Sequence, residues 1–201
     1  MQIISAQNYR RMPWKNGGGV TAEIAISPAA ATLGDFDWRI SSARVTTAGE
    51  FSRFPGIDRS LVVLDGGDLS LRLPGDQYQY LTPASAPYAF DGAAPISATL
   101  SAAAITDLNV MTRRDRCRHH LQRIAWSDPI RIDAADAGTT RLVFHALGVE
   151  LHCHSSATGQ MIALPAGGTL LLDAADAIEL KPASAAPDAR AMLYLIEITT
   201  R

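Results

Sequence analysis

The chain has 201 residues, 47% of them hydrophobic, and its 18 Lys and Arg against 20 Asp and Glu give a formal net charge of -2 at pH 7. This length allows one large or two small domains with a sizeable core, and the near-neutral charge gives no general reason to bind nucleic acid. Because no apolar run approaches the ~20 residues of a membrane helix, residues 1–9 lack a signal-peptide pattern, and Cys117 and Cys153 are the only cysteines, we expect a cytoplasmic protein that contacts no membrane.

Short strands separated by turn signals are predicted along almost the whole chain. In chain order, the expected strands are residues 20–27, 36–46, 59–65, 68–73, 96–100, 105–112, 121–126, 141–147, 149–154, 168–173 and 190–199. Residues 28–35 and 113–120 are expected to form loops or single helical turns, and no segment has the period of a long amphipathic helix. Many short strands with Gly- and Pro-containing turns predict an all-β sandwich or barrel.

The first distinctive stretch, RMPWKNGGGVTAEI, runs from residue 11 to residue 24. A phosphate-binding loop needs its lysine after the glycines and a helix behind them, whereas Lys15 precedes Gly17 and the residues that follow alternate as a strand does. No helix N-terminus is therefore offered to a phosphate. Two interpretations remain: a glycine-rich turn or bulge that feeds a strand, or backbone left bare for a ligand.

A weak internal repeat divides the chain into two similar parts. LTPASA at residues 81–86 returns as LKPASA at 180–185, and GGDL at 66–69 aligns with GGTL at 167–170. The offsets, 99 and 101, are both close to half of the chain length. We therefore expect two duplicated β units, residues 1–100 and 101–201. Coincidence in an alanine-rich chain is the alternative.

Metal binding is the next candidate function. His152 and His154 share one face of an expected strand with Glu150, and such a set could hold Zn, Fe or Mn. No second well-placed histidine follows, and Leu151 and Cys153 would take the core face. We therefore expect the two imidazoles to face solvent.

Two features around residue 117 have ordinary explanations. Cys117 lies among arginines, which can lower the pKa of a thiol, but no oxyanion loop accompanies it and we interpret it as a structural thiol. The basic run RRDRCRHH at residues 113–120 could grip an acidic ligand or a protein partner. Local ion pairs at a solvated edge are the interpretation that we favour.

Polar side chains on otherwise hydrophobic strands indicate a ligand pocket. Arg39 and Ser41 lie on one side of their expected strand. Asn109 lies on the face of its expected strand opposite to that of Leu108 and Val110, and Arg59 follows a tight Pro-Gly turn. An apolar pocket with a few convergent donors is what a small anion needs, and Arg binds a carboxylate through two parallel hydrogen bonds. The polar set is Lys15, Asn16, Arg39, Ser41, Arg59 and Asn109.

Three stretches give the chain a family resemblance. PWKNGGGVTAEI, FDWRISSARVTTAGEFSRFPGIDRSLVVLDGG and DLNVMTRR resemble the HutD/Ves family of bacterial proteins, over most of the first half and as far as Arg114. The resemblance implies an all-β bicupin, with two cupin-like β-barrel or jelly-roll halves in one compact chain. Cupin enzymes commonly hold a metal with a His-x-His motif, and where that motif would fall this chain has SRFPG at residues 52–56. A pocket without metal or other cofactor is therefore implied.

The resemblance also implies a function. HutD proteins are linked to histidine utilisation, and the resemblance implies a regulator that binds a small acid of that pathway, such as urocanate or formylglutamate. Ves-like members are associated with a stress or cold response. We therefore expect a non-catalytic protein that binds a small carboxylate. The alternative is an enzyme of the cupin class, an isomerase, a lyase or a metal-dependent enzyme, that acts on a small carboxylate. Whether the chain forms a homodimer is left open.

The glycine-rich stretch at residues 11–24 would then help to bind the ligand. Its glycines would let the backbone approach the ligand and expose N–H donors, the basic side chains would supply charge, and Trp14 would form a wall or lid. Trp14 could instead belong to the core, and Arg39 could pair with Glu23 or Asp58. The expected ligand-binding residues are Trp14, Lys15, Asn16, Gly17, Gly18, Arg39, Ser41, Arg59 and Asn109.

Overall fold

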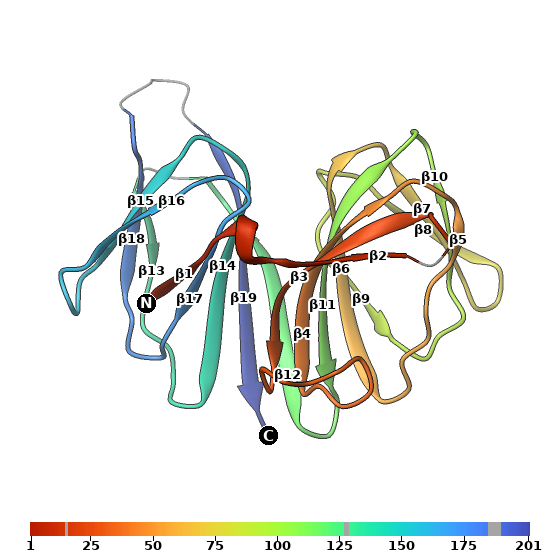
Figure 1. The fold of residues 1–201 in the computed structure, drawn as a ribbon, viewed down its shortest axis with the longest axis horizontal. Coiled ribbons are helices and arrows are strands. Elements are labelled where there is room, and N and C mark those ends of the chain that lie inside the picture. Colours follow the sequence, from red (N-terminus) through yellow and green to blue (C-terminus); the bar gives the residue numbers. More distant parts are fainter. Residues whose placement is uncertain (15, 127–128, 185–189) are drawn as a thin grey trace. The chain divides into compact units, whose positions relative to one another are not determined.

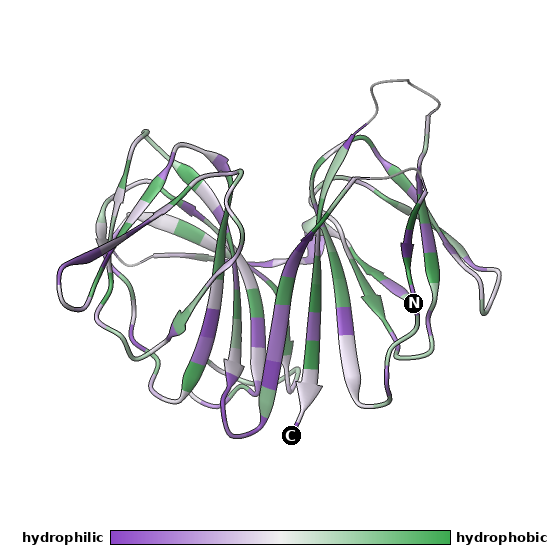
Figure 2. Cartoon of the chain, turned by 180° about the vertical axis from the view of Figure 1, so that it is seen from behind, coloured by the Kyte–Doolittle hydropathy of each residue, from purple (hydrophilic) through white to green (hydrophobic). Residues whose placement is uncertain are grey.

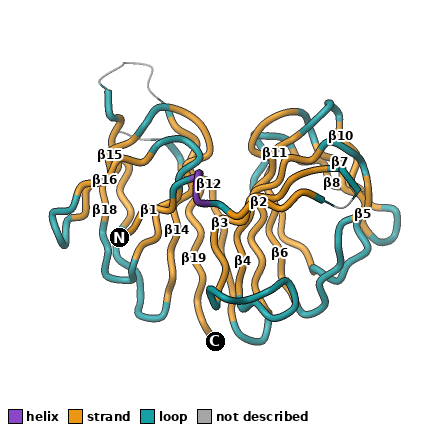
Figure 3. Tube along the Cα trace, in the orientation of Figure 1, coloured by secondary structure: helices purple, strands orange, loops and turns teal. Residues whose placement is uncertain are grey.

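The structure, a computed structural model, describes residues 1–14, 16–126, 129–184 and 190–201. Its regular structure is almost entirely β-strand, and the helical structure described is one 3-10 turn, η1, at Ala6–Asn8 (Figure 3). No described helix has the length and apolar character that crossing a lipid bilayer requires. The chain divides into two compact units, which we call unit 1 (Met1–Asn8 with His119–Thr200) and unit 2 (Tyr9–Arg118 with Arg201).

Unit 2 consists of two antiparallel sheets (Figure 1). The larger sheet has the order β2-β3-β4-β11-β6-β9, formed by Arg10–Pro13, Gly19–Ser27, Trp38–Val45, Ile105–Arg113, Ile57–Gly66 and Tyr88–Asp91. The smaller sheet has the order β5-β10-β7-β8, formed by Gly49–Glu50, Ser97–Leu100, Leu69–Leu73 and Gln77–Leu81. Both orders are open, so the described strands of unit 2 form a two-sheet sandwich and not a closed barrel.

Unit 1 has the same kind of architecture. Its larger sheet has the order β1-β17-β14-β19-β12, formed by Gln2–Ile4, Thr169–Leu172, Thr139–Gly148, Ala191–Thr200 and Cys117–Ile124. Its smaller sheet has the order β13-β18-β15-β16, formed by Ile130–Ile132, Ile178–Pro182, Leu151–Ser155 and Met161–Leu164. Strand β1 pairs with β17 through Ile3 and Leu170, which places the first residues of the chain in this unit.

The two units differ in their bounds from the halves expected from the sequence, residues 1–100 and 101–201. Strand β11 follows residue 100, yet it pairs with β4 and β6 in the middle of the larger sheet of unit 2. Strand β1 lies in the expected first half, yet it pairs in unit 1. The division therefore falls after Arg118, and the first eight residues belong with the second segment.

The strands that correspond between the two units are not the ones matched by the sequence repeat. Residues 66–69 lead from β6 into β7, whereas residues 167–170 lead into β17, a strand with different neighbours. The strand registers instead match β6 with β14, 82 positions later, because each has a bulge two residues before its terminal glycine. These glycines, Gly66 and Gly148, both have positive φ, of 97° and 119°.

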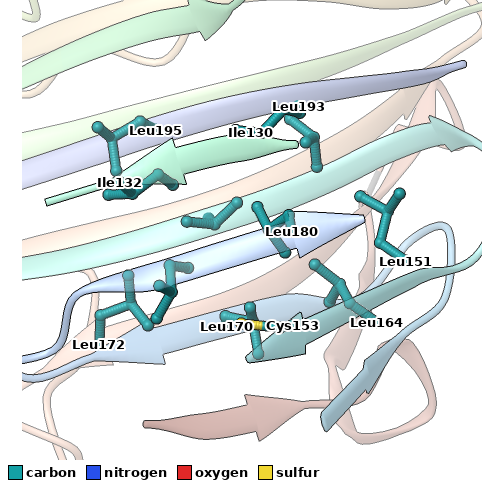
Figure 4. Packing of buried hydrophobic residues seen from close by; sticks show 12 residues of the cluster. Ile130, Ile132, Leu151, Cys153, Leu164, Leu170, Leu172, Leu180, Leu193 and Leu195 are labelled. Atoms are coloured by element: carbon teal, nitrogen blue, oxygen red, sulfur yellow. The ribbon is translucent and has the colours of Figure 1, made fainter. Parts of the chain in front are cut away.

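An apolar core fills the space between the two sheets of each unit. In unit 2, Ala43 of the larger sheet packs in one cluster with Leu69 of the smaller sheet. In unit 1, Leu193, Leu180 and Cys153 belong to a cluster composed mainly of leucine and isoleucine (Figure 4). Bands of hydrophobic and hydrophilic residues alternate along many strands (Figure 2), as expected when successive side chains point to opposite faces.

Every strand predicted from the sequence overlaps an observed strand, and residues 28–35 form the expected loop. The prediction for residues 113–120 is only partly right, because a turn at 114–116 is followed by the start of β12 at Cys117. The strands that were not predicted have at most five residues each. They are β1, β2, β5, β8, β9, β13, β16 and β18.

Candidate functional site

Four of the predicted site residues lie on the interior face of the larger sheet of unit 2. Ser41 on β4 pairs with Asn109 on β11, and Asn109 pairs with the core residue Leu61 on β6. Paired residues of neighbouring strands share a face, and so do residues two positions apart along one strand. Arg39 and Arg59, each two positions from this row, therefore face the same interior.

Arg39 has a buried counter-ion in Glu23. The Nε atom of Arg39 donates to Oε2 of Glu23 at 2.6 Å, and its Nη1 atom is 3.4 Å from Oγ of Ser41. The other carboxylate oxygen of Glu23 lies 3.0 Å from Nη2 of Arg10, a mostly exposed side chain. The pairing with Glu23 is one of the alternatives that the sequence left open, and it balances the charge of Arg39.

Arg59 is buried without a comparable counter-ion. Its residue exposure is 8%, and no described carboxylate forms an ion pair with it. Nε donates to Oδ1 of Asn109 and Nη1 to the carbonyl of Ser52, both at 3.3 Å, while no described residue accepts a hydrogen bond from Nη2. A buried charge is costly unless it is paired. Arg59 is therefore the described cation of this interior that an incoming anion would stabilise most.

Three phenylalanine rings surround the Arg59 guanidinium. Its Cζ atom lies 4.9 Å from the ring centroid of Phe90, 5.1 Å from that of Phe51 and 5.9 Å from that of Phe54. Burial lowers the pKa of Arg59 to about 10, and the nearby charge of Asp107 opposes this change. The guanidinium keeps its charge at neutral pH, in apolar surroundings that strengthen its attraction for a carboxylate.

Asp107 is the second buried carboxylate of this interior, beside Glu23, and it was not predicted. It lies on β11 with 5% exposure, two residues from Asn109 on the same face. Its Oδ1 atom accepts a hydrogen bond from the Ala43 N–H at 2.9 Å, and no described residue donates to Oδ2. Burial raises the pKa of Asp107 to about 7, against the opposing effects of the Ala43 hydrogen bond and the Arg59 charge. The spacing of two from Asn109 was the sequence signal that could have identified it.

Trp14 lies partly buried against the apolar core of unit 2. Its Nε1 atom donates to Oγ1 of Thr21 at 2.8 Å. A Cβ atom at Gly19 would lie 3.2 Å from the indole ring, so glycine gives the ring room to pack against the backbone. This placement is compatible with both expectations for Trp14, a pocket wall and a core residue. Lys15, the next predicted site residue, lies outside the described residues.

Asn16, Gly17 and Gly18 belong to the tight turn between β2 and β3. The Gly17 N–H donates to the Trp14 carbonyl at 3.0 Å, and the Gly18 N–H donates to Oδ1 of Asn16 at 3.0 Å. Gly17 has a φ of 71°, a conformation that glycine adopts without strain. The expectation that these two N–H groups are exposed to a ligand is wrong, because the turn uses both of them.

The His152 and His154 side chains face solvent, as expected. Both are exposed on β15, while Leu151 and Cys153 between them are buried in the core of unit 1. Glu150 is exposed as well. Within the part of the chain that the structure describes, no three His, Cys, Asp or Glu side chains are grouped so as to hold a metal ion.

The basic run around Arg114 and Arg116 makes the local ion pairs that we favoured. Arg114 lies 2.8 Å from Asp58, and Arg116 lies 2.6 Å from Asp37. Each pair joins partly exposed groups, so it contributes little to stability but offsets positive charge. Cys117 is buried, and burial raises the pKa of its thiol, which agrees with a structural role.

Unit 1 has an arginine at the position that corresponds to Arg59. Arg141 lies on β14, 82 positions after Arg59 on the matching strand β6, and its exposure is 1%. The Nη1 and Nη2 atoms of its guanidinium donate to main-chain acceptors of its own unit, while its buried Nε has no described acceptor. The main-chain acceptors are the carbonyl oxygens of Asp133, Asp173, Ala174 and Asp176.

Comparison with known sequences gives matches over most of the chain. A family model described as HutD matches residues 6–188. An uncharacterized 21.2 kDa protein in the hutC 3' region of Pseudomonas putida is 38% identical over 156 residues, which cover 78% of this chain and 75% of that protein. The protein Ves of Citrobacter koseri is 42% identical over 115 residues, covering 55% of this chain and 59% of that protein. These matches confirm the resemblance found in the first half of the sequence.

Comparison with solved structures concerns the fold. The structure of HutD from Pseudomonas fluorescens SBW25 matches with a TM-score of 0.78 and 30% identity, covering 100% of this chain and 98% of that one. A Bacillus subtilis oxalate decarboxylase variant matches with a TM-score of 0.63 at 8% identity, covering 98% of this chain and 76% of that one. The expected cupin-like architecture is confirmed, with open pairs of sheets in both units.

Proposed function

Because this chain belongs to the HutD family, we propose that unit 2 binds a small organic acid and that Arg59 holds the carboxylate of that acid. The proposed ligand is urocanate-like or formylglutamate-like, and its binding regulates histidine utilisation or a stress response in the cytoplasm. The proposal includes no metal, cofactor or catalytic step.

The observation that carries this proposal is the missing counter-ion of Arg59. The same interior supplies Arg39 with a carboxylate at 2.6 Å, whereas Arg59 has only neutral acceptors at 3.3 Å. A carboxylate is planar and can accept from two guanidinium N–H groups at once. The rings of Phe51 and Phe90 would contact the apolar body of the ligand, as in small-molecule sites generally.

The remaining predicted residues have supporting roles in this proposal. Asn109 orients the Arg59 guanidinium through its Oδ1 atom, and Ser41 contributes a hydroxyl on the same face. Trp14 and the turn at 16–18 shape the surroundings of the site without supplying the Gly17 and Gly18 N–H groups. Lys15 is proposed as an additional positive charge, which Lys15→Ala tests.

Isothermal titration calorimetry at pH 6–7 with formate, urocanate and formylglutamate tests the proposal. Formate is included because the related Pseudomonas fluorescens structure was obtained in a formate condition. We expect saturable one-to-one binding of at least one of these acids to the wild-type chain. In Arg59→Met we expect at least a tenfold weaker affinity, because a charge-assisted hydrogen bond contributes about 1.5–3 kcal/mol.

The matched control is Arg72→Met. Arg72 lies on β7 of the same unit, but its side chain is 59% exposed and pairs with Asp76. It should bind each acid as the wild-type chain does. Binding that is lost equally in both variants, or that is absent from the wild-type chain for all three acids at millimolar concentration, would contradict the proposal.

A further inference from the structure

The charged side chains buried in the described part of unit 2 consist of two cations and two carboxylates. They are Arg39, Arg59, Glu23 and Asp107. With all four ionised, the interior is neutral before any ligand enters. A bound carboxylate would then leave one excess negative charge in apolar surroundings, which is costly. A proton taken up by one of the two buried carboxylates removes that excess.

The contacts of the two carboxylates differ. Glu23 has an arginine on each of its oxygens, at 2.6 and 3.0 Å. Asp107 has one backbone N–H on Oδ1 and no described donor on Oδ2, so Oδ2 has room for a proton. Protonating Glu23 would break an ion pair with Arg39, whereas protonating Asp107 breaks no ion pair. Asp107 is therefore the carboxylate that accepts the proton at lower cost.

The groups facing this interior come from both sheets of unit 2. In the larger sheet, each of the five neighbouring strands β3, β4, β11, β6 and β9 contributes one charged or titratable side chain. In the smaller sheet, the core residues on β7, β8 and β10 are leucines and alanine. The charged or titratable groups are Glu23 on β3, Arg39 on β4, Asp107 on β11, Arg59 on β6 and Tyr88 on β9.

We infer that unit 2 takes up a proton together with its ligand: when a carboxylate binds beside Arg59, the Oδ2 atom of Asp107 receives a proton from solvent. This inference rests on the proposed function and adds to it the protonation state of the bound form. Asp107 then sets how affinity depends on pH without itself contacting the anion.

The charges around Asp107 determine the direction of the effect. The positive charge of Arg59 holds the pKa of Asp107 down, so an anion that neutralises Arg59 lets that pKa rise above its value of about 7. Above pH 7 the free chain has mostly lost this proton and the bound chain keeps it. By linkage, the affinity must then fall as pH rises, by about tenfold per pH unit for one proton.

Calorimetric titration with formate at pH 6, 7, 8 and 9, in two buffers with different heats of ionisation, tests the inference. Formate remains ionised throughout, because carboxylic acids titrate near pH 4, so the probe does not supply the proton. At pH 8 we expect the wild-type chain to take up about 0.5–1 proton per formate bound. The dissociation constant should rise about tenfold from pH 8 to pH 9.

Asp107→Asn is the matched variant, because the amide keeps an oxygen for the Ala43 N–H but cannot titrate. Its affinity for formate should be constant from pH 7 to pH 8, with no proton uptake at pH 8. Should this variant fail to fold, the buffer comparison on the wild-type chain still decides.

The outcomes separate the two proposals. Formate binding without proton uptake at pH 8, or an unchanged pH dependence in Asp107→Asn, overturns the inference and leaves the proposed function standing. No binding of formate, urocanate or formylglutamate at pH 6, where Asp107 already holds its proton, overturns both.

Discussion

Arg59 and Arg141 occupy the same place on matching strands of the two units, yet their surroundings differ. Each lies seven residues before the glycine that ends its strand, Gly66 or Gly148. The Arg141 guanidinium donates to four backbone carbonyls of unit 1. The Arg59 guanidinium makes two long hydrogen bonds, and phenylalanine rings surround it.

The strand beside each arginine shows the same contrast. On β11, the residues that pair with β6 at the next interior positions are Asn109 and Asp107. At the corresponding positions of β19 are Leu195 and Leu193, both in the apolar core of unit 1 (Figure 4). One scaffold thus has an arginine held by backbone carbonyls of its own unit and an arginine that we propose binds a ligand. A buried arginine indicates a binding site only when its own unit does not satisfy it.

Replacing each arginine by methionine should separate the two roles most strongly. Arg141→Met leaves the four carbonyl groups without their donor, and we expect a loss of about 3–5 kcal/mol in the free energy of unfolding. Arg59→Met replaces an unpaired buried charge by an apolar side chain of similar length, and we expect a change within about 2 kcal/mol of zero. Urea-induced unfolding followed by circular dichroism measures both.

The control for these two variants is Arg131→Met, because the Arg131 side chain is 71% exposed. It should change the free energy of unfolding by less than about 0.5 kcal/mol. Equal losses in Arg59→Met and Arg141→Met would mean that both arginines are structural.

The matching glycines provide a test of the shared scaffold. At both Gly66 and Gly148, a Cβ atom would meet the backbone of the facing strand, and φ is positive. We expect Gly66→Ala and Gly148→Ala each to lower the free energy of unfolding by about 1–3 kcal/mol. Gly75→Ala is the control, since φ is 75° but nothing lies within 4 Å of the added atom, so its loss should be smaller. A large loss at one matching glycine and none at the other would argue against equivalent strands.

Unit 2 should also show a pH-dependent stability that comes from Asp107 and that the leucine at the matching position of unit 1 cannot produce. The pKa of Asp107 is about 7 in the folded chain and about 3.9 in an unfolded one. The folded state therefore keeps a proton that the unfolded state has released, which favours folding at low pH. Relative to Asp107→Asn, the wild-type chain should lose roughly 1.4 kcal/mol per pH unit between about pH 4 and pH 7.

The difference between wild type and Asp107→Asn should be constant above pH 7 and below pH 4, where folded and unfolded chains hold the same number of protons at this site. Subtracting the variant removes the contributions of all other carboxylates. A difference that does not vary with pH would place the Asp107 pKa near its ordinary value.

The sequence predicted the fold well where strands are long and poorly where they are short. Strands such as β6 and β19 have ten residues each and a strong apolar pattern. Strand β8, with the sequence QYQYL, has mostly exposed residues and a single buried leucine. Such a short polar strand is stabilised by its pairing with β7, which its own sequence does not reveal.

The side chains of the candidate site were predicted only in part, for a related reason. The parity of Asn109 relative to Leu108 and Val110 was read correctly, but both faces of β11 are buried, and the polar face is the one inside unit 2. Phe51 and Phe90 lie 39 positions apart, and they meet because β9 pairs with β6 and because the Phe51 N–H donates to the Ile96 carbonyl. The repeat was misplaced because Gly, Ala and Ser recur in turns throughout this chain, whereas the matching bulges have no common residues.

The pairing of β1 with β17 has a consequence for how the protein is made. Ile3 finds its partner, Leu170, 167 positions later, while unit 2 apart from Arg201 is one continuous run between them. At a synthesis rate of 5–20 residues per second, roughly 10–30 seconds pass between the synthesis of β1 and the synthesis of its partner strand β17. Unit 2 can therefore complete its sheets during translation, and β1 must be kept from mispairing until β17, Thr169–Leu172, has emerged.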